Sequence, residues 1–226
     1  PVSSQALDLR SGTAALPDGS LFLECDVANA ESVDRCIDQG VARLGGELRV
    51  VVHCAGVGYV EKLVHGDEMH SAEAFDWVLR VNAMGTFHVL RSAARIMSRN
   101  PPGDDSQSPS RGVIIAVASV AAFEGQQGQV AYAASKGAVA GMVLPAARDL
   151  ARRHIRVLAL APGPFETPMV KALPESVRAK LAADALTPPR LGRPEEFAAL
   201  VATLAANPYV NGTTVRLDAG ARLSKL

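Results

Sequence analysis

The chain has 226 residues, 48% of them hydrophobic and 20% charged, which is the composition of an ordinary globular protein with a substantial core. Lysine and arginine together number 23, as do aspartate and glutamate, so the charge balance indicates a small-molecule partner rather than nucleic acid or an anionic membrane. No apolar run approaches the ~20 residues that span a bilayer. Three cysteines without metal-ligand spacing indicate a reducing compartment, and we expect a cytoplasmic protein.

Short apolar runs alternate with longer segments of helical pattern along the chain. The runs are rich in β-branched residues and end in small or polar ones, which is typical of parallel strands buried on both faces. They predict strands at residues 21–23, 50–52, 113–118, 155–160 and 214–217. Helical patterns lie near residues 29–44, 71–99, 129–153 and 194–206. This alternation predicts an α/β fold, with a doubly wound, mostly parallel, Rossmann-like sheet in a single domain over residues 1–226.

The residues that follow the predicted strands are candidates for a binding site. In open parallel sheets a ligand lies beyond the carboxyl ends of the strands. The residues expected to line this crevice are Asp26, Ala55, Gly56, Ser119, Pro162 and Gly163. Tight turns also need small residues at strand ends, so no single one of these residues indicates a site. The site is indicated because all six are expected at the same edge of the sheet.

Tyr132 and Lys136 carry the sharpest chemical signal. Their four-residue spacing near the start of a predicted helix places both side chains on one helix face. A free phenol has a pKa of about 10, and a nearby ammonium lowers it, which makes the phenol a usable acid–base group. A surface tyrosine beside a solvated lysine would have the same spacing. Ser119, at a strand end thirteen residues earlier, adds a hydroxyl that can hold the reacting oxygen.

The chain resembles the short-chain dehydrogenase/reductase family in a combination of motifs. These are Tyr132-x-x-x-Lys136, Ser119, Asn82 within residues 81–85, the turn Cys54–Ala55–Gly56, and Pro162–Gly163. The resemblance covers roughly residues 21–220. The run at residues 111–126 is similar to a branch that oxidises 3-hydroxyacyl-CoA or hydroxysteroids and belongs to fatty acid metabolism.

The resemblance implies a role for each matching residue. Tyr132 would exchange a proton with the alcohol or ketone oxygen, Lys136 would lower its pKa, and Ser119 would orient the substrate. Asn82 would anchor a water molecule that relays protons from Lys136. The residues implied in NAD binding are Asp26, Val27, Cys54, Ala55, Gly56, Tyr132, Lys136, Pro162, Gly163, Phe165 and Thr167. Gln129, with Ser119 and Tyr132, is a candidate substrate contact, although a solvated loop residue fits that position equally well.

The family's glycine-rich phosphate-binding turn has no counterpart in this sequence. By resemblance Pro1 falls just beyond the second strand of the family's sheet, so we expect an N-terminally incomplete domain that lacks the first β-α-β unit. The missing strands would separate the strand at residues 21–23 from that at 50–52, unless the former repacks against the latter. The acid that distinguishes NAD from NADP lies in the missing part, so the choice stays open, and the resemblance favours NAD.

Three functions therefore remain under consideration. The first is an NAD-dependent 3-hydroxyacyl-CoA or hydroxysteroid dehydrogenase, acting on an acyl-CoA or steroid-like small molecule. The second is an NADP-dependent 3-oxoacyl reductase, and the third is a non-catalytic binding subunit with a dehydrogenase fold. The resemblance also implies a homodimer or homotetramer, formed through the helix at residues 129–153, although its small residues suit packing within one chain as well. The five histidines have no metal-ligand spacing, and no metal site is expected.

Overall fold

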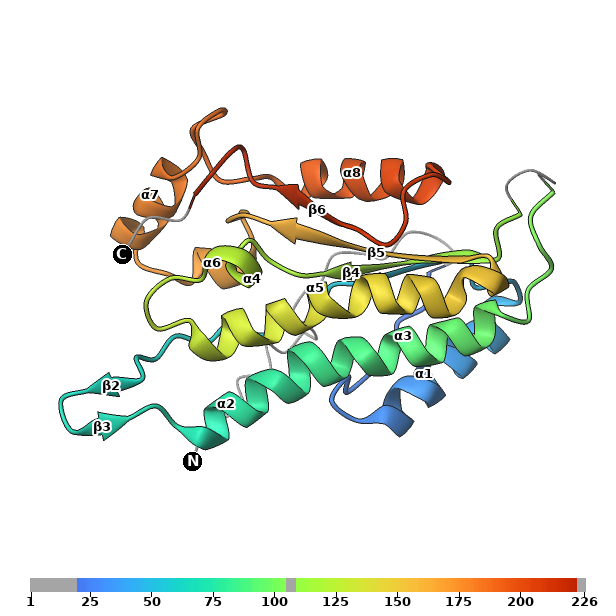
Figure 1. The fold of residues 1–226 in the computed structure, drawn as a ribbon, viewed down its shortest axis with the longest axis horizontal. Helices are drawn as coiled ribbons and strands as arrows, with labels where there is room; N and C mark the ends of the chain where they lie inside the picture. Colours follow the sequence, from blue (N-terminus) through green and yellow to red (C-terminus); the bar gives the residue numbers. More distant parts are fainter. Residues whose placement is uncertain (1–19, 105–108, 223–226) are drawn as a thin grey trace.

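The computed structural model describes residues 20–104 and 109–222, and these form a parallel sheet of four strands in the order β1-β4-β5-β6 (Figure 1). The strands are β1 (Val50–His53), β4 (Gly112–Val117), β5 (Ile155–Pro162) and β6 (Thr214–Leu217). All three pairings are parallel, with Val51 opposite Ile114 and Ile114 opposite Val157. The predicted parallel α/β sheet is confirmed.

Helices follow the strands as the alternating pattern predicts. The longer ones are α1 (Ala30–Leu44), α2 (Ala72–Leu79), α3 (Gly85–Met97), α5 (Val130–Leu150), α7 (Glu175–Ala183) and α8 (Pro194–Ala206). The single turns α4 (Ala121–Glu124) and α6 (Pro168–Lys171) lie at the carboxyl end of the sheet, and a π-helical turn (Arg80–Met84) joins α2 to α3. A 3-10 turn (Ala151–Arg153) extends α5, and a small hairpin of β2 (Val64–His65) and β3 (Glu68–Met69) projects from the region between β1 and α2.

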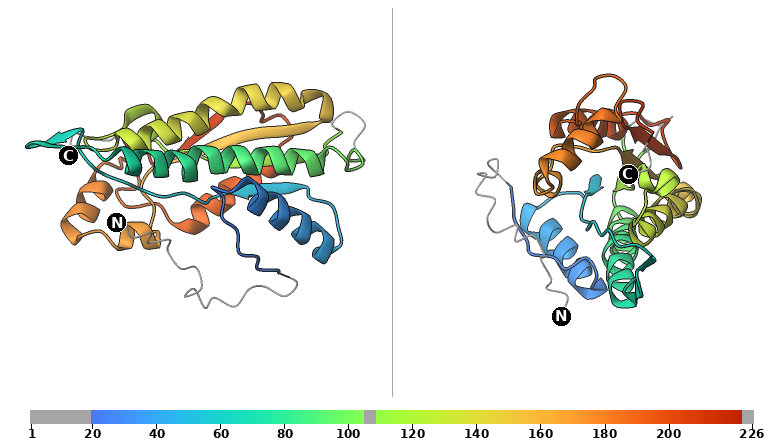
Figure 2. Two further views of the ribbon diagram at one scale, coloured as in Figure 1. Left: turned by 90° about the horizontal axis from the view of Figure 1, so that it is seen from below. Right: turned by 90° about the vertical axis from the view of Figure 1, so that its left-hand side faces the viewer.

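The sheet lies between two layers of helices. Figures 1 and 2 show α1, α3 and α5 on one face and α8 on the other. Alternate residues of β4 point to opposite layers, because side chains of a strand alternate between faces. Ile114 belongs to the cluster with α3 and α5, whereas Val113 and Ile115 belong to the cluster with Leu204 of α8. This double burial explains the continuous apolar runs in the sequence.

The strand predicted at residues 21–23 is wrong. Leu21 to Leu23 form no strand, and β1 pairs only with β4 in the part of the chain that the structure describes. Leu23 lies instead against α1, where its Cδ1 is 3.8 Å from the position of a Cβ added to Gly40. An apolar run becomes a strand only where another strand offers backbone partners, and β1 does not reach this segment.

Helix α5 is the apolar element of the greatest length. Together with its 3-10 extension it is long and apolar enough to cross a membrane by length and composition, the one such helix among the described residues. The expectation concerned uninterrupted apolar runs, and Lys136 and Arg148 interrupt this helix, whose mean hydropathy comes mainly from its alanine and valine residues. Val139 and Val143 of this helix belong to a core cluster with Ala116 and Ala159 of the sheet, so it is a core helix of the fold.

Candidate active site

Ser119 begins the site at the end of β4. The strand runs out at Val117, and Ser119 is buried at 7% exposure before the chain turns into α4. Its Oγ accepts a hydrogen bond from the backbone N–H of Ala121 at 3.1 Å. That bond uses a lone pair of the oxygen and leaves the hydroxyl proton for a second partner.

Tyr132 and Lys136 lie one turn apart on α5, as their spacing predicts. Lys136 Nζ is 5.9 Å from the centroid of the Tyr132 ring. The Tyr132 side chain also forms a hydrogen bond with the Ser119 hydroxyl. The structure therefore brings together Ser119, Tyr132 and Lys136, as the sequence motif predicts.

The electrostatics of this trio differ from the expectation. Burial raises the pKa of the Tyr132 phenol, and the hydrogen bond with Ser119 opposes that rise only in part. Lys136 Nζ donates to the carbonyl oxygen of Val117 at 2.8 Å, so this bond does not involve the phenol. Burial also lowers the pKa of Lys136 from 10.5 to about 8, while nearby Cys54 opposes the change. The expected lowering of the phenol pKa by the ammonium is thus not found in the protein by itself.

Asn82 links the site to the π-helical turn on which it lies. The side chain is fully buried, and its Nδ2 donates to Val57 O and to Ser135 Oγ, both at 2.9 Å. Its Oδ1 accepts from Val57 N at 2.8 Å, and Ser135 Oγ donates to Tyr132 O at 2.7 Å. π-Turns inside α-helices are frequent at functional sites. Asn82 therefore holds the loop after β1 against the first turn of α5, and its role in proton relay stays a prediction.

Gly56 lies where a side chain would disturb the site. A Cβ added there would be 3.1 Å from Asn82 Oδ1 and 3.2 Å from Lys136 Nζ. Cys54 and Ala55, just before it, are exposed at the carboxyl end of β1. The loop after β1 therefore passes directly over Lys136, as the resemblance implies for the cofactor side of the cleft.

Four further predicted cofactor residues, Pro162, Gly163, Phe165 and Thr167, lie at and after the end of β5. Pro162 and Gly163 end β5, beside Ser119, and Val120 N donates to Pro162 O at 3.1 Å. Thr167 caps α6 through its Oγ1, which accepts from Val170 N at 3.3 Å. The ring of Phe165 packs edge-to-face on Phe197 of α8, with centroids 6.0 Å apart, so its side chain serves packing in this structure.

Asp26 and Val27, two of the residues that the resemblance implies in NAD binding, lie just before α1. Asp26 is exposed, and its Oδ1 accepts from Ala28 N at 3.0 Å. Val27 is partly buried, and its carbonyl oxygen is hydrogen-bonded to His88 Nδ1 at 2.9 Å. Gln129, the candidate substrate contact, uses its Oε1 to accept from Gln126 N at 2.9 Å, which places it in the loop before Tyr132. None of these contacts tests a role in binding.

His53 was missed by reasoning from the sequence. It is 7% exposed at the end of β1, and burial, with the charge of Lys136, lowers its pKa from 6.5 to about 4. Its position directly before Cys54 is the one signal in the sequence that could have suggested it. A neutral imidazole therefore lies beside the ammonium of the site. No group of three potential metal ligands occurs in residues 20–104 and 109–222.

A doubly wound parallel sheet with serine, tyrosine and lysine at the carboxyl ends of its strands defines an oxidoreductase of the dehydrogenase class. A family model described as enoyl-(acyl carrier protein) reductase matches residues 4–222. The chain belongs to the short-chain dehydrogenase/reductase family.

Proteins similar to this chain include several dehydrogenases. The chain is 44% identical over 210 residues to 3-hydroxyacyl-CoA dehydrogenase type-2 of Mus musculus, covering 92% of this chain and 79% of that protein. It is 35% identical over 199 residues to the (3R)-3-hydroxyacyl-CoA dehydrogenase of Rattus norvegicus, covering 87% and 72%. The crystal structure of 3-hydroxyacyl-CoA dehydrogenase type-2 from Mycobacterium avium is similar with a TM-score of 0.82 at 35% identity, covering 91% and 78%.

Proposed function

We propose that the protein interconverts a 3-hydroxyacyl-CoA and the corresponding 3-oxoacyl-CoA with NAD. The observation that carries this proposal is the meeting of Ser119, Tyr132 and Lys136 where β4 and α5 approach each other. The similarity to dehydrogenases named for 3-hydroxyacyl-CoA supports the substrate class. A nicotinamide cofactor, when bound, accepts or supplies the hydride.

The residues present fit the nicotinamide–ribose end of such a cofactor. Lys136 Nζ lies close to the loop after β1, where a Cβ added to Gly56 would be 3.2 Å from it, and Cys54 and Ala55 of this loop are exposed. Lys136 would hold the ribose hydroxyls, and Pro162 and Gly163 would form the opposite wall. NAD rather than NADP is proposed on the similarity to the relatives alone.

The protein's part in the reaction follows from the hydrogen bonds around Tyr132. In reduction, the buried phenol stays protonated because of its raised pKa, and it donates its proton to the substrate carbonyl oxygen. In oxidation, the same oxygen takes the hydroxyl proton. Ser119 would donate its hydroxyl proton to the reacting oxygen, in place of the phenol oxygen that it bonds in this structure, and would stabilise the charge that develops there.

The direct test is the oxidation of 3-hydroxybutyryl-CoA by the purified protein, followed by the absorbance of reduced nicotinamide with NAD and then with NADP. Tyr132→Phe removes the acid–base group, and we expect kcat to fall at least about 100-fold. Tyr209→Phe is the matched control, because Tyr209 is 98% exposed, and its kcat should equal that of the wild type. Comparable activity of Tyr132→Phe would refute the proposed role, and faster turnover with NADP would favour the reductase alternative. Binding of NADH without turnover would favour the non-catalytic subunit.

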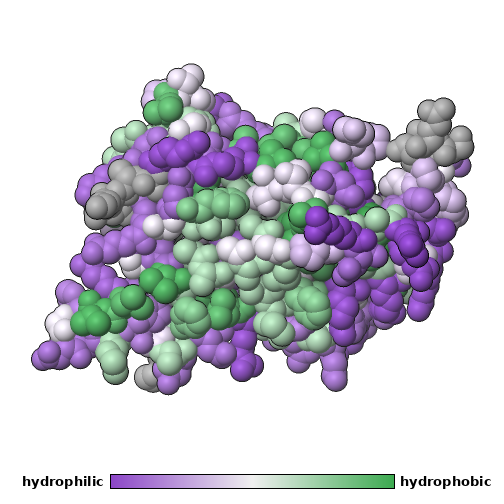
Figure 3. All heavy atoms as spheres, in the orientation of Figure 1, coloured by the Kyte–Doolittle hydropathy of each residue, from purple (hydrophilic) through white to green (hydrophobic). Residues whose placement is uncertain are grey.

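We also propose a homo-oligomer that forms through α3 and α5. The two helices lie side by side on one face, and apolar and small residues gather over them (Figure 3). Phe87 of α3 and Leu144 of α5 are 48% and 45% exposed, and a contiguous apolar patch of this kind is typical of an interaction surface. Light scattering on wild type and on Phe87→Glu tests it, since a charge there should yield monomers. A cytoplasmic location stays a prediction.

A further inference from the structure

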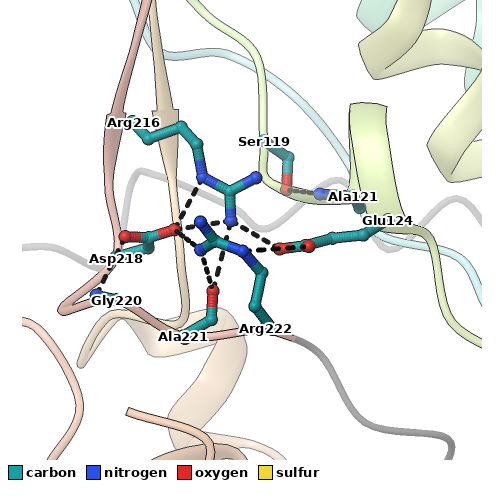
Figure 4. A network of polar contacts seen from close by, with 8 residues as sticks. All are labelled: Ser119, Ala121, Glu124, Arg216, Asp218, Gly220, Ala221 and Arg222. Atoms are coloured by element: carbon teal, nitrogen blue, oxygen red, sulfur yellow. Dashed lines mark hydrogen bonds and ion pairs between the residues drawn. The ribbon is translucent and has the colours of Figure 1, made fainter. Parts of the chain in front are cut away.

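A cluster of four charged side chains joins the end of β6 to α4 (Figure 4). Arg216 Nη2 is 2.5 Å from Glu124 Oε1 and 2.6 Å from Asp218 Oδ2, and Arg216 Nε donates to Asp218 Oδ2 at 2.8 Å. Arg222 lies further off, with its Nη1 3.5 Å from Asp218 Oδ2 and its Nε 3.9 Å from Glu124 Oε2. We call these four residues the arginine clamp. Its charges cancel, and Arg216 is its centre.

The clamp differs from the other ion pairs on the surface. The side chains of Asp218, Glu124 and Arg216 are 10%, 23% and 28% exposed, so water screens them less than it screens an ordinary surface pair. Isolated exposed pairs stabilise little, whereas several charges in one network hold their geometry better. Arg216 Nη2 also donates to the carbonyl oxygen of Ala221 at 3.2 Å. One guanidinium therefore fixes three points of the chain.

One end of the clamp bears on the catalytic serine. Ser119 Oγ accepts from Ala121 N, and Ala121 begins the single turn of α4 that ends at Glu124. Because a helix of one turn is not stable by itself, its position depends on what its ends contact. Helix α4 packs against α5, and at its far end the bond between Glu124 and Arg216 adds a contact with the segment after α8.

The other end of the clamp packs against the Pro162–Gly163 segment. Asp218 follows β6, and a Cβ added to Gly163 would lie 3.0 Å from Asp218 Cβ. Gly163 N also donates to Leu217 O at 3.0 Å. The segment after β6 is therefore packed directly on the Pro162–Gly163 segment beside which the cofactor is proposed to bind.

We propose that Glu124 and Arg216 are positioning residues, which fix the Ser119 hydroxyl relative to the Pro162–Gly163 wall and so to the reacting carbon. The proposal rests on the proposed function, since it assigns Ser119 to the substrate oxygen. Glu124 and Arg216 touch neither substrate nor cofactor, and they act through α4. Their loss should lower kcat more than it raises KM, because a donor displaced from its place stabilises the transition state less.

The kinetic test compares three variants. Glu124→Gln keeps the shape of the side chain and removes its charge, and we expect kcat to fall about tenfold with KM within about twofold of the wild type. Glu124→Asp keeps the charge and should restore most of kcat. Glu47→Gln is the matched control, because Glu47 pairs with Arg49 at the other end of the sheet with a side chain 42% exposed. Its kcat should not change.

A second measurement does not depend on activity. Amide hydrogen exchange over residues 119–125 should be faster in Glu124→Gln than in the wild type, with α5 and β4 unchanged. Should Glu124→Gln fail to fold, Arg216→Lys replaces it, with the same two outcomes expected. A kcat within twofold of the wild type, or unchanged exchange over residues 119–125, would overturn the proposal. If the wild type does not oxidise 3-hydroxybutyryl-CoA, the proposed function fails, and the exchange measurement still decides whether the clamp positions Ser119.

Discussion

Replacing Lys136 by methionine should stabilise the fold while it removes activity. Lys136 is 5% exposed, and burial lowers its pKa from 10.5 to about 8. This difference of 2.5 pKa units, at about 1.36 kcal/mol each, means that folding a charged Lys136 costs about 3 kcal/mol. Methionine avoids this cost but loses the hydrogen bond from Nζ to Val117 O, which contributes about 1 kcal/mol. The free energy of unfolding at pH 7 should therefore rise by about 2 kcal/mol.

The pH dependence of this gain gives it a signature. Between pH 10.5 and 8 the unfolded chain binds a proton at Lys136 that the folded chain does not, so the wild type loses stability as the pH falls through that window. Below about pH 8 both states are charged and the cost is constant. The advantage of Lys136→Met should thus be full at pH 7 and shrink as the pH rises toward 10.5.

Urea unfolding of Lys136→Met and the wild type at pH 7 and pH 9.5 measures this difference. The control is Lys62→Met, since Lys62 is exposed and its replacement should change the free energy of unfolding by less than about 0.5 kcal/mol. A Lys136→Met variant no more stable than the wild type at pH 7 would refute the reasoning, because the buried ammonium would then be fully compensated by its surroundings. Residues that cost stability and support activity are expected at active sites.

Two further predictions concern the end of β1 and the loop that follows it. Gly56→Ala would place a methyl group 3.1 Å from Asn82 Oδ1 and 3.2 Å from Lys136 Nζ. We therefore expect kcat to fall about tenfold while the circular dichroism spectrum stays that of the native protein. Unchanged kinetics would show that both side chains can move aside. His53→Asn removes a buried imidazole whose pKa is lowered from 6.5 to about 4. As the pH falls from 6.5 to 4, the imidazole of the unfolded chain binds a proton and that of the folded chain does not. The free energy of unfolding of the wild type should therefore fall by up to about 3 kcal/mol over this range, whereas the variant has no such loss. Urea unfolding at pH 7 and at pH 4.5 measures this difference. An equal decrease in the free energy of unfolding for the wild type and for His53→Asn would refute the prediction.

The parallel sheet and its helices were predictable because burial on both faces leaves a plain pattern in the sequence. Ile114 and Ile115 face opposite helix layers, so the run around them has no polar interruption. The small residues after β1, β4 and β5 then marked the edge where the site lies. Strand order, and the partner that each strand finds, depend on contacts between distant residues. Leu21 to Leu23 carry a similar apolar pattern and form no strand, and among the described residues β1 pairs only with β4.

The details that reasoning from the sequence missed arise where tertiary contacts override local patterns. Residues 71–99 read as one helix, yet the chain widens into a π-turn at Arg80–Met84 that carries Asn82. The hairpin of β2 and β3 has strands of two residues each, too short for an alternating pattern to show. His53 resembles any polar residue after a strand until its burial beside Lys136 is known.

The same limit applies to the acid–base pair itself. A spacing of four residues establishes that Tyr132 and Lys136 share a helix face, but the pKa of each depends on how much water the surrounding chain excludes. Here burial acts on both groups in the direction of their neutral forms, raising the pKa of the phenol and lowering that of the ammonium. Protein that excludes water in this way favours a phenol that donates its proton, which is the form needed for reduction. In oxidation the phenolate must form against that burial, so the hydrogen bond from Ser119, rather than the spacing to Lys136, is the contribution within the chain that lowers the phenol pKa.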